Sequence, residues 1–329
     1  MTIQQEYSVS PFIENETVNL RQPMLRGYLM AIVTWLGFTC LGFTSIGFIS
    51  SAQAEDIHRE KSIYRNIVVK ESYGRRCLVF TVKRGDRNQT CMDLSEPKKL
   101  VFPYVRMTLA GLLLSPEPER ILVIGLGGGS IPMALNEMYP SAYIDVVEID
   151  EAVIKVAKRF FNFAENERLK VHAADARVYT KRAGLQRKRY DMIILDAFTG
   201  DYIPEHLMTK EYLEETKALL TGSGILIANT FSTSDLYDHE SVTYSEVFGP
   251  FFNFKMPNTG NRVIISSSEA LPSDFVLRSR AKKLSATLQN YGVDVEVFPQ
   301  FMRRDIDWDT EKRSLTDQYN PANLLRSES

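Results

Sequence analysis

The sequence predicts an α/β protein with a Rossmann-like, doubly wound sheet, preceded by a small antiparallel β region. The first observation is an apolar stretch, 121–124, that runs directly into a glycine-rich turn. The second is another apolar stretch, 143–150, that ends in acidic residues. The third is the alternation of short strand-like and helical runs that follows, with short connections. This alternation is typical of a parallel sheet covered by helices on both faces.

The glycine turn is the most informative local feature. Gly125, Gly127 and Gly129 permit a tight turn and the close approach of a ligand at the start of the next helix. Glu148 ends the second strand 19 residues beyond Gly129, about where nucleotide-binding folds place an acid on the ribose hydroxyls. The glycine turn and Glu148 together predict a site for a nucleoside. The alternative is a turn with a purely structural role.

Composition and length set the domain organisation. The chain has 329 residues, 44% of them hydrophobic, and a formal net charge of −2, so it can bury one large core and a smaller unit, and nothing in it indicates a nucleic-acid partner. The expected divisions are a polar lead at 1–23, a signal peptide or membrane anchor at 24–54, a small β domain at 55–97, a Rossmann-like domain at 98–270, and a C-terminal helix and tail at 271–329.

The N-terminal apolar run, 27–48, is long enough to span a bilayer. It ends in small residues of which Ala52 and Ala54 have the form of a signal-peptidase site. We therefore expect an exported or membrane-anchored protein, with export favoured and a location on the cytoplasmic face not excluded. A buried soluble helix is the third alternative, and the charged flanks oppose it.

The cysteines bear on the same question. Cys77 and Cys91 flank a predicted hairpin turn at 83–87 and lie at nearly mirrored positions about its centre. A cross-strand pair would be close enough to form a disulfide in an oxidising compartment, and two unrelated buried thiols are the alternative.

The remaining elements follow from periodicity and from turn residues. Alternating runs separated by a Tyr-Gly turn predict a small antiparallel sheet with strands at 64–72 and 76–83. We expect helices at 97–114, 131–139, 151–161, 176–182, 209–220, 236–248 and 273–291. Further strands are expected at 169–173, 190–196 and 224–229, and the last two, 251–255 and 261–266, are expected to form an antiparallel hairpin.

Polar residues follow the carboxyl ends of the predicted parallel strands, where open α/β sheets bind ligands. In chain order these are the glycine turn, Glu148, Asp175, Asp196 and Asn229. Each acid taken alone could instead cap a helix, as Asp175 or Asp150 could. His206 and His239 lie in predicted loops near this edge and are expected to anchor them by hydrogen bonds; no metal site is expected, because no further ligand has suitable spacing.

These motifs resemble the spermidine synthase (polyamine aminopropyltransferase) family, in particular its bacterial spermidine synthase-like branch. The similarity runs from about residue 64 to residue 266, with a weaker match at 315–321. Its most specific parts are Val-Glu-Ile-Asp at 147–150, the strand at 190–196 and the loop that continues to residue 209. The resemblance implies a fold of the S-adenosylmethionine-dependent methyltransferase type.

The resemblance also implies roles for individual residues. Glu148 would hold the ribose of a sulfonium nucleoside, and Asp175 its adenine amine. Asp196 would face the nitrogen of the polyamine substrate, and Tyr104 would line the channel for the aminopropyl group and the amine. An amine that attacks the carbon beside a sulfonium needs a carboxylate that orients it and takes its proton.

Four positions depart from the family pattern. Gly128 stands where the family has an acid for the ammonium tail of the donor, and Arg65 stands where it has glutamine. The nearest second acid after Asp196 is Asp201, and Asn229 replaces a glutamine. A cation at Arg65 that reached the tail would favour intact S-adenosylmethionine over its decarboxylated form, whereas Arg65 directed to solvent would favour neither.

The expected activity is transfer of an aminopropyl or related group from decarboxylated S-adenosylmethionine, or from S-adenosylmethionine, to a small amine such as putrescine. Methyl transfer and nucleoside or polyamine binding without catalysis are the alternatives. The position two residues before the first glycine, where many methyltransferases carry an acid, is Val123, which disfavours methyl transfer. A homodimer is left open.

Overall fold

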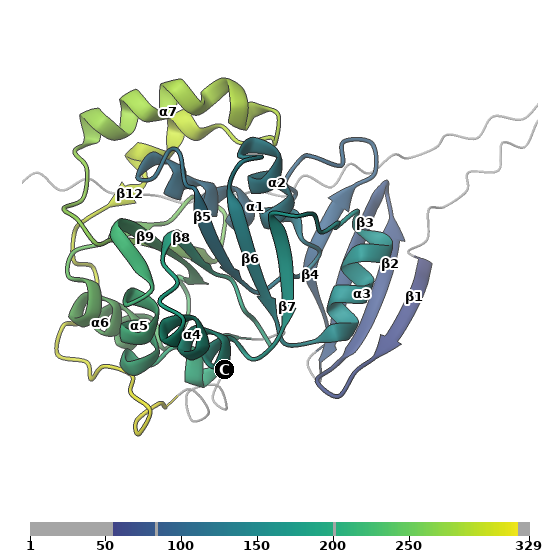
Figure 1. Cartoon of the computed structure of the whole chain (residues 1–329), viewed down its shortest axis with the longest axis horizontal. Helices are drawn as coiled ribbons and strands as arrows, with labels where there is room; N and C mark the ends of the chain where they lie inside the picture. Colours follow the sequence, from purple (N-terminus) through teal and green to yellow (C-terminus); the bar gives the residue numbers. More distant parts are fainter. Residues whose placement is uncertain (1–54, 83–84, 200–201, 322–329) are drawn as a thin grey trace, which may run out of the picture. The chain divides into compact units, whose positions relative to one another are not determined.

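The computed structural model describes residues 55–82, 85–199 and 202–321, which contain two β-sheets (Figure 1). The first is an antiparallel sheet in the order β1-β2-β3-β4. Its strands are β1 (Glu55–Lys61), β2 (Asn66–Ser72), β3 (Arg75–Val82) and β4 (Gly85–Asp93). The apolar side chains of β2 and β3 pack against helix α3 (Glu151–Phe160) and form a small core of their own. The small antiparallel sheet was predicted, but β1 was not.

Cys77 and Cys91 form a disulfide across β3 and β4. The two residues are direct partners in the strand register, and their Cα atoms are 4.0 Å apart. The predicted cross-strand bridge is therefore present in the structure.

The second sheet has eight strands in the order β12-β10-β11-β9-β8-β5-β6-β7. Five are parallel: β5 (Arg120–Ile124), β6 (Tyr143–Glu148), β7 (Leu169–Ala173), β8 (Tyr190–Leu195) and β9 (Leu220–Phe231). The other three run antiparallel to their neighbours: β10 (Phe252–Phe254), β11 (Asn261–Ser267) and β12 (Met302–Arg303). The β10–β11 hairpin and the predicted fold class are confirmed.

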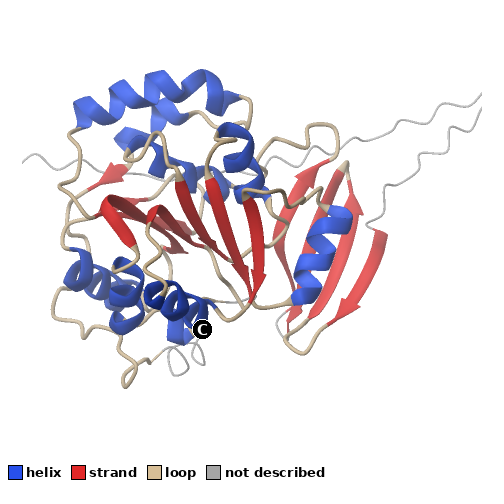
Figure 2. Cartoon of the chain, viewed as in Figure 1, coloured by secondary structure: helices blue, strands red, loops and turns tan. Residues whose placement is uncertain are grey.

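Helices cover both faces of this sheet, as Figure 2 shows. Successive residues of β5 point to opposite faces, so Ile121 and Val123 belong to one core while Leu122 and Ile124 belong to the other. One face is covered by α1 (Pro103–Thr108), the 3₁₀ helix η1 (Leu109–Leu113), α2 (Ser130–Met138) and α7 (Asp274–Gln289). The other face is covered by α4 (Ala176–Leu185), α5 (Lys210–Lys217) and α6 (Tyr237–Phe248).

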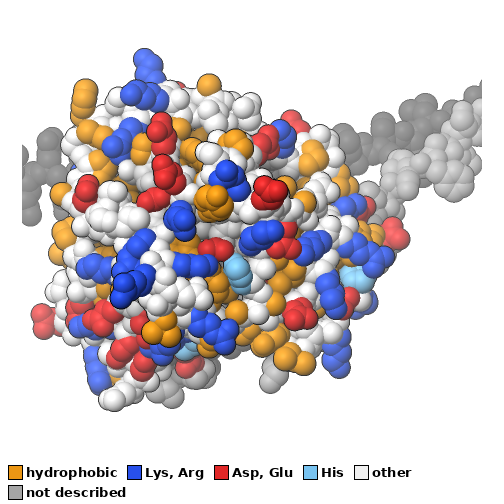
Figure 3. Space-filling model, viewed as in Figure 1, with side chains coloured by type: hydrophobic (Ala, Val, Ile, Leu, Met, Phe, Trp, Pro, Cys, Tyr) orange, Lys and Arg blue, Asp and Glu red, His pale blue; other side chains and the backbone are white. Residues whose placement is uncertain are grey.

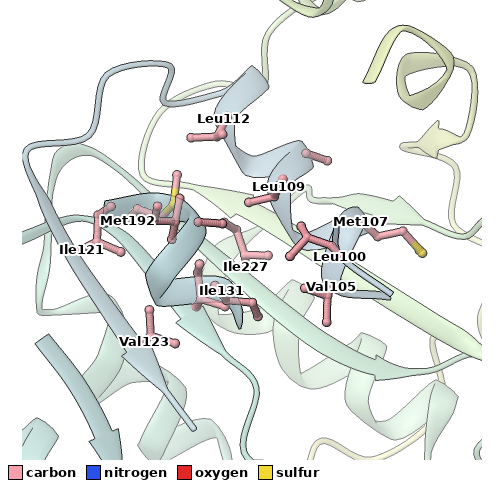
Figure 4. Close-up of a cluster of buried hydrophobic side chains, with 14 of the residues drawn as sticks. Leu100, Val105, Met107, Leu109, Leu112, Ile121, Val123, Ile131, Met192 and Ile227 are labelled. Carbon is pink, nitrogen blue, oxygen red and sulfur yellow. The ribbon is translucent and has the colours of Figure 1, made fainter. Parts of the chain in front are cut away.

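The helix predicted at 97–114 is shorter and changes type along its length. It begins at Pro103, whose fixed φ and missing N–H suit a first helical position, and it passes into the 3₁₀ helix η1 at Leu109. Figure 4 shows this segment against the sheet, where Val105 and Leu109 pack near Ile227 of β9. This packing anchors α1 beside the sheet and thereby places Tyr104.

The C-terminal part is more structured than the predicted polar tail. Two elements follow α7: the 3₁₀ helix η3 (Val295–Gln300) and strand β12, which pairs with β10 and extends the sheet. Leu315 is fully buried, and its backbone N–H donates to Thr243 Oγ1 at 2.8 Å. The segment around Leu315 therefore packs into the domain and is not a solvated tail.

The predicted signal peptide or anchor, 24–54, lies outside the described residues, as does the polar lead before it. Within the described ranges, none of the helices is both long and apolar enough to cross a membrane. On the face of the molecule drawn in Figure 3, basic and acidic side chains are interspersed.

A buried ion pair joins β11 to α6. Arg262 and Glu240 are almost completely buried, and Arg262 Nη2 lies 2.7 Å from Glu240 Oε2. Arg262 also donates to Thr230 Oγ1 at 2.8 Å and Ser241 Oγ at 2.6 Å. Tyr202, in the loop after β8, donates its hydroxyl to Glu240. The pair thus connects the antiparallel end of the sheet to the loop that follows β8.

We predict that Arg262→Met lowers the free energy of unfolding by about 3–5 kcal/mol, because it leaves the Glu240 carboxylate buried without its cation. The double variant Arg262→Met/Glu240→Leu should recover most of that loss, because both charges are then removed. Urea unfolding measures both changes.

The control is Arg303→Met, which breaks an exposed pair with Asp305 and should change the unfolding free energy by less than about 1 kcal/mol. Equal losses in the single and double variants would show that the charge pairing does not explain the effect.

Candidate active site

A cavity of about 200 Å³ lies at the carboxyl ends of β5, β6 and β8, where the small sheet meets the large one. Its wall contains Gly125 and Gly127 of the glycine turn, but not Gly129, and three carboxylates, Glu148, Asp175 and Asp196. The small sheet and the segment before β2 contribute Tyr64, Arg65, Phe80, Gln89 and Thr90, and α1 contributes Tyr104. The structure therefore brings Glu148, Asp175 and Asp196 together in one cavity, whereas Asn229 is not part of its wall and contacts it through a hydrogen bond to Asp196.

The glycine turn depends on close backbone packing. Gly125 has φ of 98°, and a Cβ atom there would lie 2.3 Å from the carbonyl oxygen of Asp196. Asp196 N–H donates to the carbonyl of Ile124 at 2.8 Å. A side chain at position 125 would therefore push apart the two strand ends that form the floor of the cavity.

Thr90 occupies the space beside Gly128. Its Oγ1 accepts a hydrogen bond from the Gly128 N–H at 3.0 Å, and its Cγ2 would lie 2.5 Å from a Cβ atom at position 128. The acid that the family pattern places at 128 thus has no room in this chain while Thr90 is present. The sequence alone showed that the acid is missing. It did not show that Thr90, from β4 of the small sheet, fills the space beside Gly128.

Glu148 ends β6 and faces the turn. Its two carboxylate oxygens accept from Leu126 N–H at 3.1 Å and Asp150 N–H at 3.0 Å. Burial raises the pKa of Glu148, while these two N–H donors and the charge of Arg65 oppose the shift. Each oxygen that accepts one backbone donor can still accept a ligand hydroxyl.

Arg65 lies at the Glu148 side of the cavity and is held by several groups. Its Nε is 3.4 Å from Asp150 Oδ2, its Nη1 donates to the carbonyl of Phe198 at 3.2 Å, and its guanidinium lies 4.4 Å from the centre of the Phe80 ring. The side chain is 11% exposed, so it does not point freely into solvent. It forms an ion pair with Asp150.

Asp175 combines the two roles that the sequence left open. It caps α4 by accepting from Val178 N–H at 2.9 Å, and it also lines the cavity. Its second oxygen lies 3.0 Å from His206 Nε2, which anchors the loop carrying His206 as predicted. His239 differs, because it belongs to α6, bonds to the carbonyl of Arg313 at 2.6 Å, and is not part of the cavity wall.

Asp196 follows β8 and has the clearest chemical signature. Burial raises its pKa to about 7, against the opposing effect of Asn229, whose Nδ2 donates to Oδ1 at 2.8 Å. Tyr104 lies in the same wall, donates its hydroxyl to the carbonyl of Gln89 at 3.2 Å, and has a pKa raised well above its ordinary value by burial and by Asp196. A carboxylate with a pKa near neutrality is suited to accept a proton.

Asp201, the predicted second acid, lies outside the described residues. The sequence did not indicate Thr90, Phe80 or Phe198, because each reaches the cavity through a strand pairing or loop without a motif of its own. Among the described residues, no group of three or more His, Cys, Asp or Glu side chains is arranged to hold a metal ion.

Comparison with solved structures places the fold. A probable spermidine synthase from Corynebacterium glutamicum ATCC 13032 aligns with a TM-score of 0.59 at 21% identity, covering 78% of this chain and 98% of that one. Human methyltransferase-like protein 13 in complex with SAH aligns with a TM-score of 0.53 at 25% identity, covering 68% of this chain and all of that one (100%). The methyltransferase-type fold implied by the sequence is confirmed.

Comparison of sequences places the family. The family model described as "Spermine/spermidine synthase domain" matches residues 104–259. A polyamine aminopropyltransferase of Vibrio vulnificus (strain CMCP6) is 55% identical over 280 residues, which cover 84% of this chain and 93% of that relative. With this identity over nearly the whole relative, and with the strand-end carboxylates gathered in one cavity, the chain belongs to the polyamine aminopropyltransferase family.

Proposed function

We propose that this protein transfers an aminopropyl group from decarboxylated S-adenosylmethionine to a primary amine such as putrescine, as a step of polyamine biosynthesis. The observation that carries the proposal is the placement of Asp196, a carboxylate with a pKa near 7 beside the glycine turn. Asn229 holds one of its oxygens, which leaves the other for an amine.

The chemistry follows from this placement. An alkylammonium has a pKa of about 10, so the substrate enters charged and pairs with the Asp196 carboxylate. As the nitrogen loses a proton to Asp196, its lone pair attacks the carbon beside the sulfonium. The new N–C bond forms while the C–S bond breaks, and the sulfur keeps the electron pair, so the nucleoside leaves as a neutral thioether. Because burial raises the pKa of Asp196, the carboxylate is a stronger base than an exposed one.

The rest of the cavity suits a nucleoside. The N–H groups at the start of α2 and the glycine turn allow close backbone approach, and Glu148 can accept from the two ribose hydroxyls. Asp175 can accept from the adenine amine. These assignments extend the family resemblance to residues that line one cavity.

The charges favour the decarboxylated donor. Its tail ends in an ammonium, which Asp196 attracts, and Arg65 is already paired with Asp150 on the Glu148 side. A carboxylate on the tail of intact S-adenosylmethionine would meet the negative charge of Asp196 instead. Because this chain has Gly128 where the family has an acid for that ammonium, and because the free oxygen of Asp196 binds the amine substrate, we expect neutral groups to hold the donor tail.

Methyl transfer from intact S-adenosylmethionine is the second candidate. The absence of an acid at Gly128 and the likeness to human methyltransferase-like protein 13 favour it. Mass spectrometry separates the candidates when purified protein and putrescine are supplied with each donor in turn. Aminopropyl transfer yields methylthioadenosine and a triamine, whereas methyl transfer yields S-adenosylhomocysteine and a methylated amine. A protein that binds a nucleoside and yields neither product would be a binding protein.

We further propose that the mature protein works in an oxidising compartment. The Cys77–Cys91 disulfide supports this, because such bonds persist outside reducing cytosol. The composition of residues 24–54 supports export or anchoring.

The first prediction from the proposed reaction is that Asp196→Asn lowers kcat/KM by about 100- to 10,000-fold, the usual contribution of a positioned general base. In the parent protein, kcat/KM should fall as pH drops through about 7, because protonation removes the base. Steady-state assays from pH 5.5 to 8.5 measure both effects.

The same variant should be more stable than the parent at pH 8. In the parent protein the folded-state pKa of Asp196 is raised above its unfolded value of about 4. The contribution of Asp196 to the free energy of unfolding is therefore fully present below pH 4 and is lost as pH rises through 7, where the buried carboxyl becomes charged. An asparagine at this position stays neutral and does not lose it. Asp191→Asn is the matched control, because Asp191 lies on β8, the strand that Asp196 follows, and bonds to Arg120 and Thr221 outside the cavity.

A normal pH profile and turnover in Asp196→Asn would show that Asp196 is not the base of the reaction.

The second prediction concerns Arg65. If Arg65 acts at the ribose side, Arg65→Gln should weaken the binding of both donors by the same factor, because they share the nucleoside. Isothermal titration calorimetry of the parent and the variant gives the ratio of their dissociation constants for each donor. A selective loss of affinity for intact S-adenosylmethionine would instead place Arg65 at the donor tail.

The third prediction concerns the compartment. Protein recovered from native periplasm or membranes should carry a Cys77–Cys91 bridge, and a cleaved chain should begin at Glu55. Intact mass and thiol labelling with and without reductant measure these properties. Reduction should also lower the unfolding free energy by about 3 kcal/mol, as expected for a loop of this length. Two free thiols in a full-length chain would contradict both proposals.

A further inference from the structure

A line of side-chain amides leads away from Asp196 through the sheet. Asn229, two residues before the end of β9, donates from Nδ2 to Asp196 Oδ1 at 2.8 Å. Its own Oδ1 accepts from Nδ2 of Asn261 at 3.0 Å. Asn261 is the first residue of β11, and neither asparagine is part of the cavity wall. Asn261 therefore touches Asp196 only through Asn229.

Strand register makes this contact possible. Asn229 is paired with Val263, and Asn261 lies two residues before Val263 on the same face of the sheet. The two asparagines are thus diagonal neighbours on adjacent antiparallel strands, a separation that side chains of their length can bridge. Arg262 lies between the two β11 positions and points to the opposite face, where it pairs with Glu240.

Thr259 determines which group of each amide donates and which accepts. Its Oγ1 accepts from the Asn261 backbone N–H at 3.1 Å, so its hydroxyl hydrogen is directed to Asn261 Oδ1, 3.3 Å away. Asn261 must then present its NH₂ group to Asn229. Asn229 in turn must present its NH₂ group to Asp196, because an amide rotated by 180° would set oxygen against oxygen at Asp196 and NH₂ against NH₂ at Asn261.

We infer that Asn261 is a positioning residue for the transfer reaction: it fixes the amide of Asn229 so that a donor, and not an oxygen, faces the Asp196 carboxylate. The inference rests on the proposed function of Asp196 as the base. The fixed donor holds one carboxylate oxygen in place and directs the other to the amine. Without Asn261, the nearly buried Asn229 amide can rotate and lose its bond to Asp196.

The charged groups around Asp196 come from other elements. Tyr104 faces it from α1, and the same cavity is lined by Arg65, Glu148, Asp175 and His206. None of these belongs to the amide line. Changes at Asn261 or Thr259 therefore leave those charges in place, and a shift in the titration of Asp196 reports the loss of the amide donor.

The test compares three variants with the parent protein. Asn261→Ala removes the group that fixes Asn229, and Thr259→Val removes only the hydroxyl at the far end while keeping its shape. Asn253→Ala is the matched control, an asparagine on neighbouring β10 that bonds to Tyr237 and Asp307 away from the cavity. Thermal unfolding of each variant reports the general structural cost.

Two readouts are used. One is the pH dependence of kcat/KM for aminopropyl transfer. The other is a ¹³C NMR titration of the Asp196 carboxyl in the free protein labelled at aspartate, assigned by difference from Asp196→Asn. The second readout requires neither donor nor amine, so it tests the inference even if the proposed reaction fails.

We expect Asn261→Ala to raise the Asp196 midpoint by about one pH unit, as expected for losing one hydrogen bond to a charged group. Thr259→Val should raise it by less, and Asn253→Ala should leave it unchanged while lowering the unfolding temperature. An unchanged NMR midpoint in Asn261→Ala, or an equal rise in Asn253→Ala, overturns the inference. A raised NMR midpoint in a protein that transfers no aminopropyl group overturns the proposed function but supports the part of the inference in which Asn261 fixes the amide of Asn229 against Asp196.

Discussion

The close backbone contact between Gly125 and Asp196 is the constraint on which the site depends. The two strands β5 and β8 end side by side, and only a residue without Cβ allows the Asp196 carbonyl to approach as it does. This contact places the carboxylate next to the turn that would receive a nucleoside. One backbone constraint therefore determines the distance between base and donor, and the surrounding residues adjust charge and orientation within that frame.

The sequence predicted those parts of the site that follow from position along parallel strands. Glu148, Asp175 and Asp196 lie at or just beyond the carboxyl ends of parallel strands, so the common edge of the sheet was sufficient to bring them into one cavity, and Asn229, near the end of β9, bonds to Asp196. Thr90 and Asn261 could not be found this way. Their contacts depend on which strands pair and in which register, and neither property is encoded in a local motif.

The same distinction holds for the fold. Periodicity located the parallel strands and most helices, because both depend on local burial. The strands β1 and β12 were missed, since one is rich in charged residues and the other has only two residues. The buried pair of Arg262 and Glu240 was also missed, because a charged residue in a sequence is expected at the surface unless its partner is known.

The packed C-terminal segment has a consequence for the order in which the protein can be completed during synthesis. Asp317 receives both terminal nitrogens of Arg177, at 2.7 and 2.8 Å, and the hydroxyl of Thr209 at 2.8 Å. Arg177 lies in the first turn of the helix that Asp175 caps. The N-terminal end of that helix, next to the Asp175 cap at the cavity, therefore gains this support only after Asp317, 140 positions later in the chain, has been synthesised.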